Sequence, residues 1–206
     1  MKIVRIGDSL NEYEGEFALV FWMCGCNIHC NYCYNYKTVM NLANSKFNEM
    51  DVIKAITDGA DLYSALVATG GEPTCQQDDL YKLFEVVRCK MPHSIKLKIH
   101  SNGTNLNFLS EMINDDLLDS LTFDIKLGDL VDWKLFDGDK VTYNIIEFTK
   151  RFHNIINIEW RSTLPIDYSG PDTRNIKMQS NKIGVDWIRQ TLLTEEDLKK
   201  IGELDG

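Results

Sequence analysis

The sequence predicts an α/β fold: a parallel sheet with helices outside it, arranged as an open or partial barrel. Short apolar runs of strand length alternate with segments of helical period, which is typical of βαβ units. About five such units fit in the chain, too few for the eight units of a closed barrel. No linker or repeat divides the 206 residues, so we expect a single domain over residues 1–206.

The expected strands are runs that are continuously apolar or that alternate apolar and polar side chains. They span residues 17–22, 65–69, 95–99, 121–126 and 154–163. Apolar residues three or four positions apart predict helices. These span residues 49–59, 78–89, 105–115 and 142–152, with a last helix from Thr194. In the first helix, Met50, Ile53 and Ile56 fall on the expected buried face. Before the last helix, Pro165, Gly170 and Pro171 indicate a loop, and residues 183–193 fit either a strand or a helix.

The chain is acidic, with 22 Lys and Arg against 31 Asp and Glu and a formal net charge of −9. Such a chain repels a phosphate backbone, and it has no basic run with interleaved aromatics, so we expect no nucleic-acid ligand. Charge and glycine interrupt the first eight residues, and no apolar stretch reaches the ~18–20 residues of a membrane span. We therefore expect a cytoplasmic protein with no membrane partner.

Four of the six cysteines fall between residues 24 and 33, the cysteine loop, which indicates a metal site rather than disulfides. Three of them form a cysteine trio with the spacing C-x3-C-x2-C: Cys26, Cys30 and Cys33. Thiolates select soft metals, and three on one loop suit a [4Fe–4S] cluster with one iron left open. The alternative is a structural zinc site, for which Cys24 or His29 would complete four ligands. Cys24 also offers a second spacing to Cys30.

The remaining cysteines and one histidine receive no role in the site. Cys75 and Cys89 lie in or beside a predicted helix, and we expect them to be buried apolar residues. His100 has no spacing typical of a metal ligand, and we expect it to be structural or exposed.

Further polar motifs follow predicted strands. Gly70-Gly71-Glu72-Pro73 comes after a buried run, where paired glycines allow a close backbone approach and Glu72 can accept from an ammonium. Asn102, Asp124-Ile125-Lys126 and Arg161 also stand at or just beyond strand ends. Ligands bind at the carboxyl ends of parallel strands, so we expect these groups and the trio to converge on one face. Taken alone, the same motifs are consistent with turns, exposed strand charges and a surface arginine.

In combination, these motifs resemble the radical S-adenosylmethionine (SAM) superfamily, including the aromatic Tyr32 just before Cys33. The resemblance implies a partial (β/α)6-type radical SAM barrel in which the trio binds a [4Fe–4S] cluster. The open iron then chelates the amino and carboxylate groups of SAM, and Tyr32 contacts the adenine. One electron from the cluster breaks a carbon–sulfur bond of SAM, leaving methionine and a 5′-deoxyadenosyl radical.

The resemblance also implies roles for the other motifs. Glu72 and the two glycines before it contact the SAM amino group, Asn102 contacts SAM, and the aspartate and lysine of the Asp124-Ile125-Lys126 strand lie beside it. Arg161 binds the SAM carboxylate with both arms of its guanidinium. The implied catalytic and metal-binding residues are Cys26, Cys30 and Cys33. The implied cofactor-binding residues are Tyr32, Gly70, Gly71, Glu72, Asn102, Asp124, Lys126 and Arg161.

The order of the motifs between residues 15 and 163 resembles the activating proteins of anaerobic ribonucleoside-triphosphate reductase. This implies a radical SAM oxidoreductase that abstracts hydrogen from one glycine of a large glycyl radical enzyme, with a flavodoxin- or ferredoxin-type reductant. Tyr34-Asn35 favours this group over 7-carboxy-7-deazaguanine synthases, which usually carry Asp-Thr there. The alternatives are a ring contraction of that kind on a small molecule, and a non-catalytic iron–sulfur or zinc module.

Overall fold

A computed structural model of the chain describes residues 1–33, 35–42, 45–91, 95–127 and 130–192. Its centre is a seven-stranded sheet in the order β1-β2-β4-β5-β6-β8-β9. The strands are β1 (Ile3–Ser9), β2 (Ala18–Met23), β4 (Ala65–Gly70), β5 (Lys96–Ser101), β6 (Ser120–Asp124), β8 (Asn157–Leu164) and β9 (Trp187–Thr191). β1 pairs antiparallel with β2, and every other neighbouring pair in this sheet is parallel. The six parallel strands from β2 to β9 form an open barrel, which confirms the predicted fold class.

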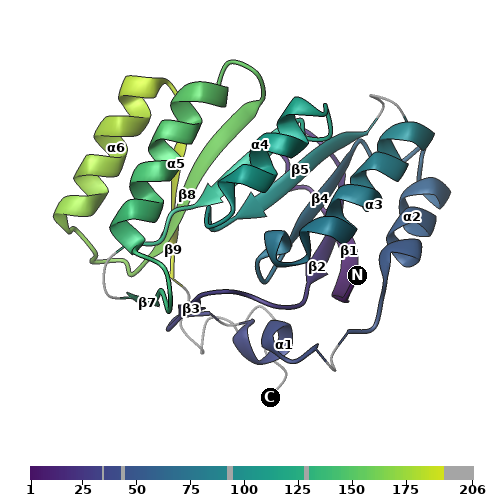
Figure 1. Ribbon diagram of the computed structural model, residues 1–206, viewed down its shortest axis with the longest axis horizontal. Helices are drawn as coiled ribbons and strands as arrows, with labels where there is room; N and C mark the ends of the chain where they lie inside the picture. The colour runs from purple at the N-terminus through teal and green to yellow at the C-terminus, as the bar shows by residue number, and fades with distance from the viewer. Residues whose placement is uncertain (34, 43–44, 92–94, 128–129, 193–206) are drawn as a thin grey trace.

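The longer helices cover one face of this sheet, as Figure 1 shows. They are α2 (Glu49–Asp58), α3 (Gln77–Lys90), α4 (Leu106–Asn114), α5 (Gly138–Phe152) and α6 (Pro171–Ile183). A 3-10 turn, η2 (Pro73–Gln76), leads into α3, and the short helix α1 (Tyr36–Met40) follows the cysteine loop. β3 (His29–Cys30) and β7 (Val131–Asp132) pair in a small antiparallel ribbon. Because β3 follows β2 and β7 follows β6, this ribbon lies beyond the carboxyl ends of the parallel strands.

The two faces of the sheet differ in polarity, because side chains alternate along each strand. In β5, Leu97 and Ile99 belong to the main core beneath the helices, whereas Lys98 and His100 occupy the opposite, inner face. Near β2 and β4 the inner face is a small apolar cluster: Ala18, Val20, Ala65 and Val67, with Tyr13 and Trp22 packed on it. Over β6 and β8 the inner positions are polar: Thr122, Asp124, Glu159 and Arg161. The polar half of this face positions the site.

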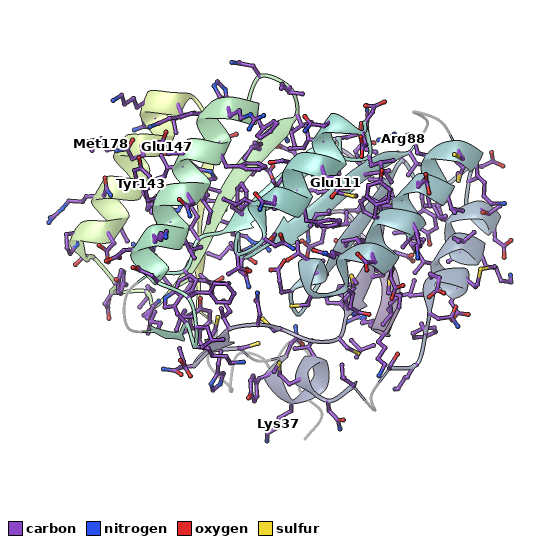
Figure 2. The ribbon with its side chains drawn as sticks, in the orientation of Figure 1. Lys37, Arg88, Glu111, Tyr143, Glu147 and Met178 are labelled. Carbon is purple, nitrogen blue, oxygen red and sulfur yellow. The ribbon has the colours of Figure 1, made fainter. Side chains whose placement is uncertain are left out.

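The amino ends of β5 and β6 are tied to α3 by Arg88, which Figure 2 labels. Its Nη2 donates to Asp119 Oδ2 at 2.7 Å, and its Nε donates to the Asp116 carbonyl at 3.0 Å. The backbone N–H of Leu97 donates to the same Asp119 oxygen at 2.7 Å. These bonds fix the relative register of the two strands, which brings the polar groups at their carboxyl ends level with each other.

The predicted strands correspond to β2, β4, β5, β6 and β8, and the first four predicted helices to α2, α3, α4 and α5. The structure adds β1, β3, β7, α1 and α6, which the sequence reasoning had not assigned. Within residues 183–193, which fitted either a strand or a helix, it forms the strand β9. α6 begins at Pro171, which had indicated a loop; proline suits the first helical position because the N–H it lacks needs no partner there. In α2 the prediction was wrong at Met50, which is 63% exposed, and Val52 is buried instead. The helix expected from Thr194 lies outside the described residues.

The outer surface of the helical layer carries Tyr143 and Glu147 of α5 and Met178 of α6, all labelled in Figure 2. Tyr143 and Met178 are both exposed. None of the helices in the described part of the chain is long and apolar enough to cross a membrane.

Candidate active site

The end of β4 lies directly against the cysteine loop. The backbone N–H of Gly71 donates to the Met23 carbonyl at 2.9 Å, and that of Glu72 donates to the Gly25 carbonyl at 2.8 Å. A Cβ on Gly71 would lie 1.8 Å from the Gly25 oxygen, and Gly70 has a φ of +113°, which favours glycine. Only glycine therefore permits this approach, and the approach brings Glu72 next to the cysteine loop.

The cysteine trio lines one small cavity of about 90 Å³, the cysteine cavity, together with the carboxyl ends of β4, β5 and β6. Its other lining residues include Gly70, Gly71, Glu72, His100, Asn102, Asp124 and Lys126. Cys24 is not among the residues that line this cavity. It is 1% exposed, and its backbone N–H donates to the Lys2 carbonyl at 3.0 Å. Burial raises the pKa of its thiol, and Lys2 and Ser45 oppose that rise. The geometry thus separates Cys24 from the trio, while the trio's role as cluster ligands stays a prediction.

The chemistry of the donor set fits an iron–sulfur cluster. Burial raises the pKa of each thiol in the trio, and the nearby positive charge of Lys126 opposes that rise. A metal centre displaces such protons and stabilises the thiolates. Among the described residues, no three Cys, His, Asp or Glu side chains are placed to hold a single metal ion. The cysteines of a [4Fe–4S] cluster bind separate irons, so they do not need to meet at one point.

Glu72 joins the carboxyl ends of β4 and β5. It is 1% exposed, and its Oε1 accepts from Thr74 N at 3.2 Å, Thr74 Oγ1 at 2.7 Å and Ser101 Oγ at 2.9 Å. Oε2 accepts from the backbone N–H of Asn102 at 2.7 Å. Burial raises the pKa of Glu72, and these donors oppose that rise. Among the described residues, Asn102 N is the one donor to Oε2, so this oxygen can accept a hydrogen bond from a further group.

Asn102 uses its side chain to hold the cysteine loop. Its Nδ2 donates to Asn27 Oδ1 at 2.9 Å, and its Oδ1 accepts from Thr104 N at 3.1 Å and from Thr104 Oγ1 at 2.7 Å. Asn27 Nδ2 closes the group by donating to Thr104 Oγ1 at 2.7 Å. The three side chains bridge the cysteine loop to the turn after β5. Asn102 is therefore a positioning residue, and its direct contact with SAM stays a prediction.

Asp124, Lys126 and Arg161 form one charge network at the ends of β6 and β8. Arg161 Nε donates to Asp124 Oδ1 at 2.8 Å and its Nη2 to Oδ2 at 3.2 Å, with Lys126 Nζ 3.8 Å from the same Oδ2. Burial opposes ionisation of Asp124, but the charges of Arg161 and Lys126 outweigh it and hold its pKa well below the usual value. Lys126 Nζ also lies 5.7 Å from the centre of the Tyr32 ring. The guanidinium fork expected to bind the SAM carboxylate thus holds Asp124, and Arg161 Nη1 faces Glu12 Oε2 at 3.5 Å.

A larger cavity of about 580 Å³ adjoins the cysteine cavity on the inner side of the sheet. The two share lining residues: Cys33, Thr69, Gly70, Asp124 and Lys126. Tyr32 and Arg161 line the larger cavity, and Gln190 and Thr191 of β9 border it. A cavity of this size suits a nucleoside or a peptide segment. The predicted site residues therefore surround two connected spaces, one at the cysteines and one beside them.

Sequence reasoning missed two residues of this site. His100 was expected to be structural or exposed and received no role in the site. It is buried, but it also lines the cysteine cavity, and its Nδ1 lies 3.2 Å from Arg161 Nη2. The sequence contained a signal for this position. His100 is two residues after Lys98 in the same strand, so both side chains fall on the inner face, and it directly precedes Ser101 at the end of that strand. Glu12 precedes β2 in an irregular segment, and no sequence pattern indicated it. Cys75 and Cys89 correct a further expectation, because both are exposed rather than buried.

Comparison with known proteins identifies the family. Residues 14–132, more than half of the chain, match the 4Fe-4S single cluster domain. The chain belongs to this family. The match includes the cysteine trio, the glycine pair, Asp124 and Lys126, and it ends before Arg161.

Two relatives agree with this membership, and a solved structure shares the fold. A protein of Methanocaldococcus jannaschii, named as a glycyl-radical enzyme activating enzyme, is 30% identical over 165 residues, covering 74% of this chain and 63% of that protein. A protein of Pyrococcus abyssi, named as a GTP 3′,8-cyclase, is 28% identical over 134 residues, covering 63% of this chain and 42% of that protein. The chain thus spans less than two thirds of either relative. The crystal structure of Streptococcus suis SuiB shares the fold, with a TM-score of 0.58 over 89% of this chain and 44% of that one, at 13% identity. The family match and the two relatives place the chain in the radical SAM superfamily.

Proposed function

We propose that this chain is a radical SAM enzyme that activates a glycyl radical enzyme by taking a hydrogen atom from one of its glycines. The observation that carries the proposal is that the two cavities share lining residues and so lie side by side, because cofactor and substrate need adjoining spaces. In the described part of the chain, β9 is the last strand of the sheet, and four of its five residues are exposed. A protein loop can approach the larger cavity along this side. The relative named as an activating enzyme supports the same substrate class.

The cysteine trio would hold a [4Fe–4S] cluster, and SAM bound beside it supplies a carbon-centred radical when the cluster is reduced. Lys126 places a buried positive charge near the trio, which favours thiolate ligands. Glu72 Oε2 offers an acceptor for the ammonium group of SAM. Tyr32 and Lys126 border the larger cavity, where an aromatic face and a cation can orient a nucleoside. The apolar cluster beyond them limits the access of water from the amino-terminal side of the inner face.

A radical SAM reaction on a small molecule is the second candidate. The similarity to a protein named as a GTP 3′,8-cyclase favours it, at 28% identity against 30% for the activating-enzyme relative. The larger cavity of about 580 Å³ also has room for a nucleotide-sized substrate, and a deazaguanine-type ring contraction belongs to the same class. The two candidates share the cofactor site and differ in where the abstracted hydrogen originates.

The decisive experiment follows the hydrogen atom. Reconstituted under anaerobic conditions, the protein should contain about four irons and four sulfides per chain. It is then incubated with SAM, a flavodoxin- or ferredoxin-type reductant, and an anaerobic ribonucleotide reductase labelled with deuterium at glycine Cα. A glycyl radical signal in electron paramagnetic resonance, with deuterium appearing in 5′-deoxyadenosine, supports the activase. Deuterium from a labelled small molecule, with no radical on the partner, supports the second candidate instead. The Cys26→Ala variant is the control and should give neither signal.

A further inference from the structure

One buried polar atom at the cysteine cavity has no partner. His100, near the carboxyl end of β5, is 4% exposed, and its ring lines the cavity with the cysteine trio. Among the described residues, no donor or acceptor contacts its Nε2, although this atom is shielded from solvent. Buried polar side-chain atoms almost always have a hydrogen-bond partner, so an isolated one beside a cavity points to a ligand.

The other side of the imidazole is engaged by protein groups. Nδ1 lies 3.2 Å from Arg161 Nη2, which can only donate, and 3.4 Å from Glu12 Oε2, which can only accept. Burial is the main cause that holds the pKa of His100 well below its usual value, and the charges of Arg161 and Lys98 add to it, so the ring is neutral. In a neutral ring one nitrogen carries the proton: Nε2 donates when Nδ1 accepts from Arg161, and Nε2 accepts when Nδ1 donates to Glu12.

Arg161 holds this arrangement in place. Two of its nitrogens bind the carboxylate of Asp124, at 2.8 Å and 3.2 Å, so the guanidinium cannot turn away from the ring without breaking that pair. Nε2 of His100 is therefore held at the boundary of the cavity where SAM is expected. The side-chain amide of the neighbouring Asn102 is engaged with Asn27 and Thr104, whereas Glu72 Oε2 accepts from Asn102 N and keeps the capacity for a further donor.

We propose that Nε2 of His100 forms a hydrogen bond with an oxygen atom of SAM bound beside the cysteine trio. This inference rests on the proposed function and adds a binding residue to it. SAM offers two kinds of oxygen to this nitrogen. The carboxylate of its methionine part accepts from an Nε2–H, and the hydroxyls of its ribose can accept from Nε2 or donate to it.

A matched pair of variants separates the two nitrogens of the ring. In His100→Asn, the shorter amide can reach Arg161 as Nδ1 does, but it has no group at the position of Nε2. In His100→Gln, the longer amide can place an N–H near that position. The affinity for SAM is measured by anaerobic titration calorimetry on reconstituted protein, with iron content and thermal unfolding recorded for each variant. The expected result is a loss of SAM affinity of about 10- to 100-fold for His100→Asn, and within about threefold of wild type for His100→Gln.

A second ligand identifies the oxygen. 5′-Methylthioadenosine has the ribose but no carboxylate, so a matching loss for this ligand assigns the ribose, and a loss confined to SAM assigns the carboxylate. Unchanged SAM affinity in His100→Asn would overturn the inference. Loss of iron from that variant would overturn it as well, because His100 would then support the cluster rather than SAM. If the wild-type protein with a full cluster does not bind SAM, the proposed function fails instead.

Discussion

The close approach of Gly71 to Gly25 makes a quantitative prediction for Gly71→Ala. The added Cβ would lie 1.8 Å from the Gly25 oxygen, whereas an ordinary carbon–oxygen contact is about 3.2 Å. One of the two backbones must therefore move by about 1.4 Å. The obstacle is backbone rather than a flexible side chain, so it cannot rotate aside.

Two costs add up in this variant. Overpacking of a rigid contact costs about 1–3 kcal/mol. The movement also breaks the 2.8 Å hydrogen bond from Glu72 N to the Gly25 carbonyl, worth about 1 kcal/mol. We expect Gly71→Ala to lose about 2–4 kcal/mol, which corresponds to a drop in Tm of about 5–15 °C for a chain of this size. The same movement displaces the residue next to Cys26, so cluster content should fall too.

The assay is thermal unfolding by circular dichroism, with iron analysis after reconstitution. Gly7→Ala is the matched control, because its Cβ would meet only side-chain atoms at 3.7 Å and 3.8 Å, within ordinary contact. In β1 the alanine should leave Tm unchanged or raise it slightly, since glycine is unfavourable inside a strand. A Gly71→Ala protein that melts within about 2 °C of wild type and binds full iron would refute the steric reasoning.

Two further predictions test the site. Alanine at any position of the cysteine trio should abolish the cluster's absorbance and SAM cleavage. Cys24→Ala should retain most of both. Loss of the cluster in Cys24→Ala, with the cluster of Cys26→Ala intact, would reverse the ligand assignment. Asp124→Asn leaves the largely buried Arg161 with Glu12 as its remaining carboxylate and should cost about 3 kcal/mol near neutral pH. Because the folded-state pKa of Asp124 is lowered, its stabilisation is fully present above the unfolded pKa of about 3.9 and declines as the pH falls from there through the folded-state pKa. The difference in Tm between variant and wild type should therefore shrink from about pH 7 to about pH 3, and a constant difference would contradict the ion pair.

The sequence was most informative at positions where one physical constraint determines which residue type can stand there. The alternation in 95–99 predicts one apolar face, and Leu97 and Ile99 of β5 lie in the main core, while Lys98 is buried on the other face. The glycine pair after β4 meets a backbone that excludes any Cβ. The trio of thiols on one loop lines one cavity, as their spacing indicated. In each case the constraint is local, or the partner follows from the rule that parallel strands end at the same edge.

Prediction was weaker where the outcome depends on a partner distant in the chain. The contacts of Arg161 and Asn102 with SAM stay predictions, and the sequence did not indicate the protein partners of either side chain. Asp124, 37 residues away, binds the guanidinium of Arg161. Asn27, 75 residues away, engages the amide of Asn102. His100 looked ordinary because its unpaired nitrogen becomes visible only once the cavity is formed. Side chains with several possible partners cannot be assigned until the fold selects one.

The bridge from Asn27 to Asn102 and Thr104 bears on the order of events during folding. Its bonds join residues 75 and 77 positions apart, and the segments between them form β4 and β5. Such distant pairings form slowly, since the entropy of closing a long loop must be overcome first. Asn27 can therefore hold the cysteine loop against the turn after β5 only once the parallel sheet has assembled. A site that depends on such distant contacts differs from small zinc domains, in which the metal drives the chain to fold.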